Sequence, residues 1–560
     1  MPSGAELFVE AAARLGIDTI FTLVGDHLNE VLAIAARRGI RIFDMRHESG
    51  VTHAADAWAR IHRKPALALV TCGPGHSNSL TGVATSNLAG SPLIAVSGSR
   101  PSTLAGRQAF QDIDQVAMAR PVVKWAAEVP GAAQIPSYLE RAYAVADSGR
   151  KGAVHLTIPV DLFTASAGGS GSPTWPPLDR PKGLSHPDRA IALLRAAQRP
   201  ILIAGSGIWW ARAEEALRRF IEITQIPLYT ITMGRGTVSD RHPLVMGYAD
   251  PALNYAVHTA FREADLFLIV GKRIDYRLAM GGARLFPPEA RFIQIDIHPQ
   301  ELGLNRPLDA AICADARLAL EALEDAAGPH PWPPRPWLER LRALRRDWEA
   351  TLAQAASDDA SPMHPAALCR ELSQALPRDV LYSWDGGDFV HWGRALLPAR
   401  EPGGWLRLGP LGAIGSSLPN ALALQLAHPR RPVAVITGDG ALGFYIAEMD
   451  TAVRHKLPIV VIVGNDAGWG LERELQSFAS GGVTVACELQ STPYDVIMRG
   501  FGGGGETVER LDQVRPAVER AFASGVPYCL NVKIRGVRSP FTEWQIAGKK
   551  KCRRPAEKPH

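Results

Sequence analysis

Two short polar motifs, each directly after an apolar run, carry the residues best suited to chemistry. The motif GDG (438–440) follows the run PVAVIT, and NDAG (465–468) follows PIVVIV. The stretch between them has helical spacing, so the two runs are predicted to be neighbouring parallel strands. The carboxyl ends of such strands meet at one edge of a sheet, where ligands bind. Asp439 and Asn465 would therefore converge there as oxygen ligands.

This ligand set favours one kind of metal. A carboxylate, an amide oxygen, a backbone carbonyl and diphosphate oxygens suit Mg²⁺ and not zinc. Gly438 and Gly440 leave room for a phosphate at the N-terminus of the following helix. GDG is a common turn and Asn a common loop residue, but the two together in these strand contexts predict a magnesium–diphosphate site.

The chain that positions these motifs is long enough for several domains. Its 560 residues far exceed the ~150 of a typical domain. Apolar strands ending in Gly-containing turns alternate with helical patterns throughout, which predicts an α/β protein with doubly wound parallel sheets. The expected units are three domains at 1–165, 186–328 and 357–540, a Gly/Ser/Pro linker at 166–185, a Pro-rich and helical linker at 329–356, and a basic tail at 541–560.

Composition excludes several classes of protein. Hydrophobic residues make up 46% and charged residues 21% of the chain, which is typical of globular proteins and not of disordered ones. The 52 Gly and 43 Pro show no period, which excludes a collagen-like chain. The six Cys are far apart with no CxxC, so neither a disulfide framework nor a zinc site is indicated, and a reducing compartment is expected.

Charge is concentrated at the end of the chain. The net charge is +5, and the last twelve residues (KKKCRRPAEKPH) hold six Lys or Arg and one Glu. Because the rest of the chain is neutral, we expect no nucleic-acid partner. No apolar run approaches the ~18 residues needed to cross a bilayer, so no membrane partner is expected. The first residues lack a signal-peptide hydrophobic region, and we expect a cytoplasmic protein.

A second glycine motif offers an alternative function. GSGIWW (205–210) follows a strand, as a dinucleotide fingerprint does, but Trp210 occupies the third glycine position. A large side chain there would block close packing of helix on strand. A nicotinamide-dependent oxidoreductase is therefore less favoured than a plain strand-to-helix turn.

From about residue 4 to 540 the sequence resembles the thiamine-diphosphate-dependent enzymes, a family that includes acetolactate synthase, oxalyl-CoA decarboxylase and 2-hydroxyacyl-CoA lyase. The resemblance implies pyrimidine-binding, central and diphosphate-binding domains in that order. It also implies that Asp439, the Asn465 side chain and the Ala467 carbonyl hold Mg²⁺ on the cofactor diphosphate. Gly464 stands where many members have the first Asn of a pair.

Further segments match the family's cofactor site. In RHESG (46–50), Glu48 resembles the glutamate that activates the cofactor through its aminopyrimidine ring. In LGAIG (411–415), Ile414 resembles the apolar wedge beneath the two rings, and the Gly412 carbonyl would accept from the aminopyrimidine. The remaining cofactor-binding positions implied by the resemblance are Gly25 and Asn78.

The resemblance narrows the choice among the reactions of this family. The segment NDAGWGLERELQ (465–476) is most similar to the 2-hydroxyacyl-CoA lyases. Such an enzyme needs a base for the 2-hydroxyl proton, whereas oxalyl-CoA decarboxylation needs none. We expect Glu472 to be this base, with Glu474 as the fallback. Gln111 is expected near the reacting centre, and His76 is a second candidate proton carrier.

The basic tail fits a CoA substrate. Its cations could neutralise the CoA phosphates while its aromatic residues cover adenine or pantetheine. A solvated, disordered terminus is an equally good interpretation. The tail residues concerned are Phe541, Trp544, Lys549, Lys550, Lys551, Arg553 and Arg554.

The expected activity is reversible cleavage of a 2-hydroxyacyl-CoA to formyl-CoA and an aldehyde or ketone. The alternatives are an acetolactate synthase-like carboligase or decarboxylase of 2-oxo acids, an oxalyl-CoA decarboxylase, and a non-catalytic nucleotide-binding or assembly protein. The resemblance also implies that Glu48 and Asp439 of different subunits form one site, so a homodimer is the minimum and a homotetramer is expected. Arg273 and Asp296 resemble positions that face FAD or ADP in relatives. ADP is favoured over FAD, and a mere packing domain is equally compatible.

Overall fold

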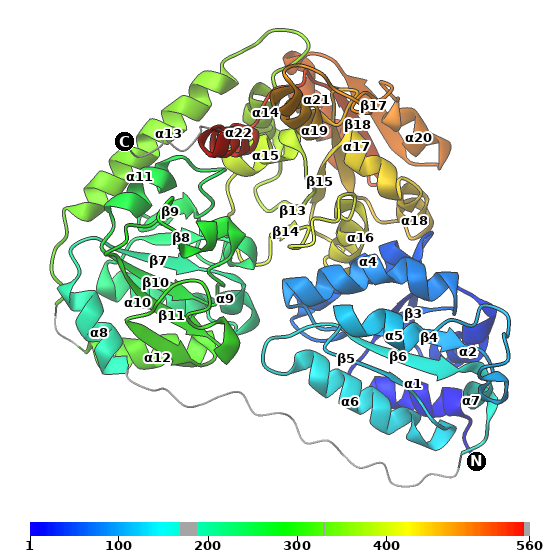
Figure 1. Ribbon diagram of the computed structural model, residues 1–560. Helices are drawn as coiled ribbons and strands as arrows, with labels where there is room; N and C mark the ends of the chain where they lie inside the picture. The colour runs from blue at the N-terminus through cyan, green and yellow to red at the C-terminus, as the bar shows by residue number, and fades with distance from the viewer. Residues whose placement is uncertain (168–186, 329–330, 554–560) are drawn as a thin grey trace.

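The computed structural model describes residues 1–167, 187–328 and 331–553. The chain folds into three α/β domains, each built on a six-stranded sheet with parallel strand pairs and helices on its faces (Figure 1). The predicted fold class is thereby confirmed. The 166–185 linker lies almost wholly outside the described residues.

The first domain has the strand order β2-β1-β3-β4-β6-β5. Its chain order reverses between β1 and β3, and ligands of open α/β sheets bind outside the carboxyl ends of the strands at such a reversal. Its elements are α1 (Gly4–Arg14), β1 (Thr19–Thr22), η1 (Asp26–Leu28), α2 (Asn29–Arg37), β2 (Arg41–Asp44), α3 (Glu48–His62), β3 (Ala66–Val70), α4 (Pro74–Ala89), β4 (Leu93–Ser99), η2 (Ser102–Leu104), α5 (Gln115–Ala119), η3 (Arg120–Val122), β5 (Trp125–Glu128), η4 (Ala132–Gln134), α6 (Ile135–Asp147), β6 (Val154–Pro159) and α7 (Val160–Thr164).

The central domain has the order β9-β8-β7-β10-β11-β12, which is the strand order of dinucleotide-binding sheets. Its reversal lies between β7 and β10. Its elements are α8 (Pro187–Ala196), β7 (Pro200–Ala204), α9 (Ser206–Trp210), α10 (Glu214–Thr224), β8 (Leu228–Thr230), η5 (Thr232–Gly234), β9 (Val245–Tyr248), α11 (Ala256–Glu263), β10 (Leu266–Val270), η6 (Tyr276–Gly281), β11 (Arg291–Asp296), η7 (Pro299–Glu301), β12 (Ala310–Cys313) and α12 (Ala316–Ala327). Residues 205–210 form a strand-to-helix turn, as predicted.

The third domain repeats the order of the first, as β14-β13-β15-β16-β18-β17. Helix α13 (Trp337–Ala356) precedes it. Its elements are α14 (Pro365–Ala375), β13 (Leu381–Trp384), α15 (Asp388–Leu396), β14 (Trp405–Arg407), α16 (Ser417–Ala427), β15 (Val433–Gly438), α17 (Asp439–Leu442), η8 (Gly443–Tyr445), α18 (Glu448–Arg454), β16 (Val460–Asn465), α19 (Gly470–Ser480), α20 (Tyr494–Gly500), β17 (Gly504–Val508), α21 (Leu511–Ala523), β18 (Tyr528–Lys533) and α22 (Pro540–Arg553).

Burial on both faces explains the apolar runs. The runs LFLIV of β10 and VVIVGN of β16 are fully buried, because helices cover both sides of each parallel sheet. Helix α3 of the first domain packs against α16 of the third, and their apolar residues share one core. The described part of the chain contains no helix with the length and apolar character of a membrane span.

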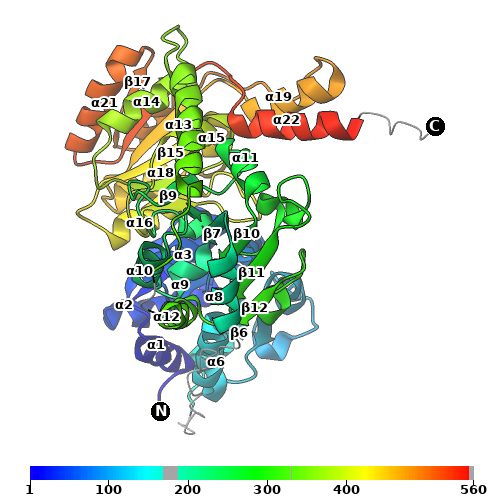
Figure 2. The same cartoon turned by 90° about the vertical axis from the view of Figure 1, so that its left-hand side faces the viewer.

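The end of the chain departs from the expected tail. Residues 540–553 form helix α22, which lies beside α19 and extends away from the three domains (Figure 2).

Candidate active site

A pocket opens at the carboxyl edge of the third sheet. It lies where β13, β15, β16 and β18 end, and every described residue that lines it belongs to the third domain. The lining residues are Pro365, Gly386, Gly387, Asp388, Phe389, Ile414, Gly438, Asp439, Gly440, Ala441, Gly464, Asp466, Gly468, Trp469, Gly470, Leu471, Glu472, Ile534, Arg535, Gly536 and Val537.

Asp439 lies at the base of this pocket, 1% exposed. One of its carboxylate oxygens accepts a hydrogen bond from the Gly468 backbone N–H at 3.0 Å, and burial raises the pKa of the group. A Cβ on Gly438 would meet no atom within 4 Å, whereas one on Gly440 would lie 2.8 Å from Trp469. Gly438 thus leaves open space beside the carboxylate, whereas the absence of a side chain at Gly440 lets Trp469 pack closely. The helix that follows, α17, has only four residues, so its dipole is weaker than the sequence suggested.

The structure brings Asp466, and not Asn465, to Asp439. Asn465 ends β16 and its side chain turns into the domain. Its Nδ2 donates to the Thr492 carbonyl at 3.0 Å and to Asn531 Oδ1 at 2.9 Å. Asp466 lines the pocket, because successive side chains at a strand end point to opposite sides. Burial and the neighbouring Asp439 charge raise the pKa of Asp466 to about 7.

The backbone ligand expected at Ala467 is also engaged elsewhere. The Ala467 carbonyl accepts from the Leu489 N–H at 2.8 Å, and the Ala467 N–H donates to Asn465 Oδ1 at 3.2 Å. Gly468, one position further, lines the pocket. The carboxylates of Asp439 and Asp466 and the backbone of this loop are therefore candidate oxygen donors for a cation. The carboxylates of Glu472 and of Asp388, which accepts from Ser539 and Thr542, also line the pocket.

The predicted wedge lies on the same pocket. Ile414 is half-buried in its wall, and a Cβ on Gly386 would lie 3.1 Å from Ile414 Cγ2. Gly412 lies in an exposed turn with a φ of 76°, a conformation that favours glycine.

The first-domain residues gather at the carboxyl edge of their own sheet. Glu48 begins α3, is 8% exposed, and accepts from Asn78 Nδ2 at 3.1 Å. Gly25 follows β1, and a Cβ there would lie 2.6 Å from Thr71. A Cβ on Gly75 would lie 3.8 Å from Glu48 Oε1. Glycines thus allow the segments around Glu48 and Asn78 to approach closely.

His27, which the sequence did not single out, also lies at the carboxyl edge of the first sheet. Its Nδ1 lies 2.9 Å from Thr71 Oγ1, and its Nε2 lies 3.3 Å from Cys72 Sγ. Gln111 joins them, since its Oε1 accepts from Cys72 Sγ at 3.5 Å. Its position in the turn after β1, two residues beyond Gly25, could have marked His27 as a candidate site residue.

His76, between Gly75 and Asn78, is turned into the domain. Its ring is 1% exposed, its Nδ1 lies 3.0 Å from Ser97 Oγ, and it packs against His155 at 4.6 Å between ring centroids. Burial lowers the pKa of His76 to about 4. The ring is therefore neutral inside the domain at neutral pH, and we withdraw it as a proton carrier.

The segment around Glu48 contacts the third domain of the same chain through residues that do not line the pocket. Glu448 accepts from the Arg46 backbone N–H at 3.2 Å, and Tyr445 OH lies 2.9 Å from Ser49 Oγ. Within one chain, Glu48 and Asp439 therefore lie on two separate surfaces.

The two candidate bases differ in their surroundings. Glu472 lines the pocket, is exposed, and its carboxylate has no hydrogen bond or ion pair among the described residues. Glu474 is held by Arg538, whose Nε lies 2.6 Å from it. The structure thus leaves Glu472 available and Glu474 engaged.

The aromatic residues of the tail are packed, not free. Phe541 stacks on His391 with centroids 4.1 Å apart, and the Arg284 guanidinium lies 4.2 Å above the Trp544 ring. These contacts tie α22 to the third and central domains and leave both aromatic side chains half-buried. Lys549 is exposed. The side chains of Lys550, Lys551 and Arg553, and all of Arg554, lie outside the described part of the chain.

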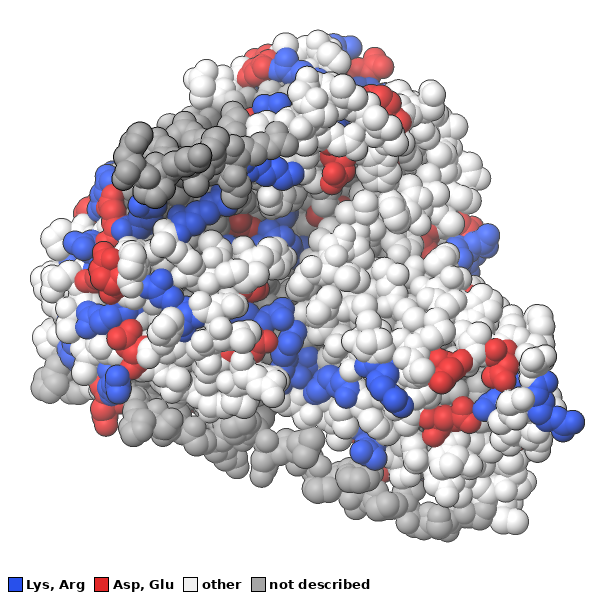
Figure 3. All heavy atoms as spheres, in the orientation of Figure 1, with Lys and Arg blue, Asp and Glu red and all other residues white. Residues whose placement is uncertain are grey.

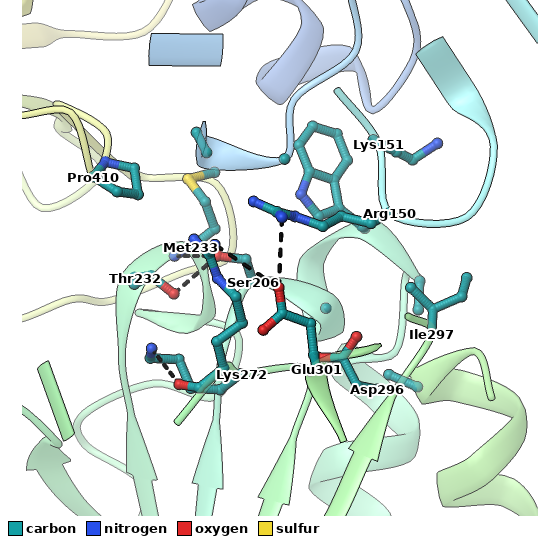
Figure 4. A pocket seen from close by; sticks show the side chains of 18 of the residues that line it. Arg150, Lys151, Ser206, Thr232, Met233, Lys272, Asp296, Ile297, Glu301 and Pro410 are labelled. Carbon is teal, nitrogen blue, oxygen red and sulfur yellow. Dashed lines mark hydrogen bonds and ion pairs between the residues drawn. The ribbon is translucent and has the colours of Figure 1, made fainter. Parts of the chain in front are cut away.

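A second cavity lies at the reversal of the central sheet. Ser206 and Gly207 follow β7, Lys272 and Arg273 follow β10, and Asp296 ends β11. Figure 4 shows Arg150 of the first domain and Glu301 across this cavity, with a closest N–O distance of 3.5 Å. Lys and Arg side chains gather along the hollow between the two domains (Figure 3). Arg273 and Asp296 thus share one cavity, as the resemblance implied.

Comparison with known proteins identifies the family. Residues 2–118, 187–323 and 385–532 match the families described as Thiamine pyrophosphate enzyme, N-terminal TPP binding domain, central domain and C-terminal TPP binding domain, respectively. The chain belongs to the thiamine pyrophosphate enzymes.

Its relatives carry two kinds of name. A probable acetolactate synthase of Mycobacterium bovis is 37% identical over 92% of this chain and 93% of its own length. A 2-hydroxyacyl-CoA lyase 2 of Caenorhabditis elegans is 31% identical over 93% of this chain and 87% of its own. A 2-hydroxyacyl-CoA lyase of rice is 31% identical over 95% of each.

The pocket fits the cofactor of this family. The buried Asp439 carboxylate and the half-buried Asp466 carboxylate line the pocket with Gly438, and Ile414 forms an apolar part of its wall. When bound, thiamine diphosphate supplies a carbon nucleophile for a substrate carbonyl.

Proposed function

We propose that this protein is a Mg²⁺-dependent 2-hydroxyacyl-CoA lyase that reversibly cleaves its substrate to formyl-CoA and an aldehyde or ketone. The observation that carries the proposal is the Glu472 carboxylate on the pocket wall, which has no hydrogen-bond or ion-pair partner among the described residues. A 2-hydroxyacyl-CoA can release a carbonyl compound only when its hydroxyl loses a proton. Glu472 takes that proton while the bond between the thioester carbon and the hydroxyl-bearing carbon breaks, and a proton delivered to the thioester carbon completes formyl-CoA.

The proposed metal ligands are Asp439, Asp466 and a backbone carbonyl of the loop that contains Gly468. This set replaces Asn465 and Ala467. Carboxylate and carbonyl oxygens, completed by diphosphate oxygens and water, are the ligands that Mg²⁺ prefers. Among the described residues no group of three or more His, Cys, Asp or Glu side chains could hold a metal by itself, so water or diphosphate oxygens would complete the proposed coordination.

Helix α22 supports a CoA ester as substrate. Residues 535–537 line the pocket, and α22 begins at Pro540, so the pocket wall leads directly into the basic end of the chain. Since Phe541 and Trp544 are packed, the proposed contacts to CoA phosphates come from Lys549 and the cations that follow it.

Acetolactate synthesis is the alternative, and the 37% identical relative favours it. Product analysis by mass spectrometry separates the two. The purified protein, with thiamine diphosphate and Mg²⁺, is given a 2-hydroxyacyl-CoA in one reaction and pyruvate in another. Cofactor-dependent formyl-CoA and an aldehyde or ketone support the lyase. Acetolactate from pyruvate, with no cleavage of the CoA ester, overturns it.

We further propose that the active unit is at least a homodimer and in full a homotetramer. The support is that all described lining residues of the pocket come from the third domain, while Glu48 lies on a different surface of the same chain. Large apolar residues are exposed beside both groups of candidate residues: Phe110, next to Gln111 in the first domain, at 84%, and Phe444, in contact with Trp469 of the pocket, at 58%. Mixing inactive Glu48→Gln and Asp439→Ala proteins should restore activity, because hybrid dimers contain one intact site. Failure to restore it after subunit exchange contradicts a shared site.

For the central cavity we propose ADP or the nucleotide part of CoA. The cavity lies at the strand reversal of a dinucleotide-type sheet, where such folds bind nucleotides, and the Asp296 carboxylate at the end of β11 lines it. Denaturing the purified protein and identifying any released nucleotide by mass spectrometry tests this. A yellow protein that releases FAD would contradict the choice of ADP.

A further inference from the structure

We propose that Arg473 is the charge-compensating partner of Asp466, which allows two carboxylates to serve a site that must also hold a diphosphate. This inference rests on the proposed metal ligands and assigns a role to an arginine that those ligands do not include.

The geometry of the pair is specific. Asp466 belongs to the loop after β16, and Arg473 lies in the first turns of α19. Arg473 Nη2 is 2.6 Å from Asp466 Oδ2, and the two side chains are 20% and 12% exposed, respectively. The Arg473 guanidinium also reaches Glu488 at 3.3 Å, but that side chain is 69% exposed. Water screens the second contact far more than the first.

The carboxylates near this loop repel one another, so a nearby positive charge stabilises their ionised forms. Asp439 and Asp466 raise each other's energy when both are ionised, and buried Asp388 adds a third negative group. The charge of Arg473 favours the ionised form of both Asp439 and Asp466, and Asp439 also interacts with the charge of Lys533. Counting only Asp439, Asp466 and Arg473, the net charge is −1. An aspartate and an asparagine would carry the same charge without an arginine.

The net charge of the site should affect the binding of Mg²⁺ and of the diphosphate in opposite directions. Free Mg²⁺ is attracted by negative charge, whereas the diphosphate is repelled by it. Removing Arg473 should therefore strengthen binding of Mg²⁺ alone and weaken binding of thiamine diphosphate. A merely structural tie between the loop and α19 predicts instead that both affinities fall.

The test is isothermal titration calorimetry on the full-length protein, first with Mg²⁺ alone and then with thiamine diphosphate at saturating Mg²⁺. The variants are Arg473→Met, Asp466→Asn, and the two combined. We expect Arg473→Met to lose about 10–100-fold in thiamine diphosphate affinity, because one uncompensated unit charge within several ångströms of a partly buried anion changes an affinity by roughly this factor. The double variant should regain most of that loss, because it restores the single net negative charge. Arg473→Lys, which keeps the charge, should lose less than Arg473→Met.

The control variants distinguish failure of the proposed metal ligands from failure of the proposed role of Arg473. Arg515→Met removes an exposed ion pair with Glu371 and should change neither affinity. If Asp466→Asn leaves Mg²⁺ affinity unchanged, the proposed ligand set fails. If Asp466→Asn weakens Mg²⁺ binding but the double variant binds thiamine diphosphate no better than Arg473→Met, the ligand set stands and the compensation proposal is overturned.

Discussion

The carboxylate of Glu448, in the third domain, accepts a hydrogen bond from the backbone N–H of Arg46 at 3.2 Å, two residues before Glu48. Thr451 Oγ1 donates to the same carboxylate at 2.7 Å. Glu448 thereby holds the segment that leads into α3, and α3 begins at Glu48. A buried acid of one domain thus fixes the position of the proposed activating glutamate of another.

Replacing Glu448 should change how stability depends on pH. Burial raises the pKa of Glu448 to about 7, from an ordinary value of 4.5. Between these values the folded chain holds a proton that the unfolded chain has lost. The resulting stabilisation, on the order of 3 kcal/mol, is complete below pH 4.5 and is lost as the pH rises through about 7. Because glutamine does not titrate, Glu448→Gln should show a smaller fall in Tm than the wild type between about pH 5 and about pH 8.

Thermal unfolding followed by circular dichroism at the two pH values measures this. Glu506→Gln is a suitable control, because hydrogen bonding from Arg520 lowers the pKa of Glu506 and its titration falls below the pH range concerned. Parallel Tm changes in the wild type and Glu448→Gln would contradict the predicted pH dependence.

Glu48→Gln should bind thiamine diphosphate but lose most turnover. The amide keeps the size of the side chain and its contact with Asn78 but cannot transfer a proton. Loss of positioned acid–base help costs about 10²–10⁴-fold in rate. Steady-state kinetics beside calorimetric cofactor binding measures both quantities. Glu10→Gln, at an exposed ion pair with Arg14, is the matched control. Unchanged turnover in Glu48→Gln would remove the central assignment.

Two neighbouring glutamates test the proposed base. Glu472→Gln should lower the lyase rate by about 10²–10⁴-fold, with a smaller effect on any decarboxylation that needs no base. Glu474→Gln should change the rate much less, because that carboxylate is engaged by Arg538. The readout is kcat with a 2-hydroxyacyl-CoA for both variants. Equal losses in the two would indicate a structural role for the start of α19.

Truncation after Ile546 tests the basic end of α22. Ile546 is 2% exposed, so the cut leaves the packed half of the helix, with Phe541 and Trp544, in place. KM for CoA esters should rise more than KM for a small free acid, because only the CoA phosphates lose cationic partners. Equal changes for both substrates would return the terminus to a solvated role.

The sequence by itself determined the three-domain α/β fold and the two edges that carry chemistry. Apolar runs such as 433–437 and 459–463 can only be buried strands of parallel sheets, and polar turns after them must lie at the carboxyl edge. The predicted roles of Asp439 as a metal ligand and of Glu48 as the activating residue followed from these local patterns and from a family resemblance that spans the chain.

Tertiary structure decided what local patterns leave open. Asn465 and Asp466 are adjacent, and which of them faces the pocket depends on how the end of β16 packs against Asn531, since neighbouring side chains point to opposite sides. His76 follows a strand as an active-site residue would, yet Ser97 and His155 hold it inside the domain. The ion pairs that occupy Glu474 and join Arg473 to Asp466 depend on partners brought close by folding. Side-chain direction and charge pairing are properties of packed neighbours, so only the folded chain fixes them.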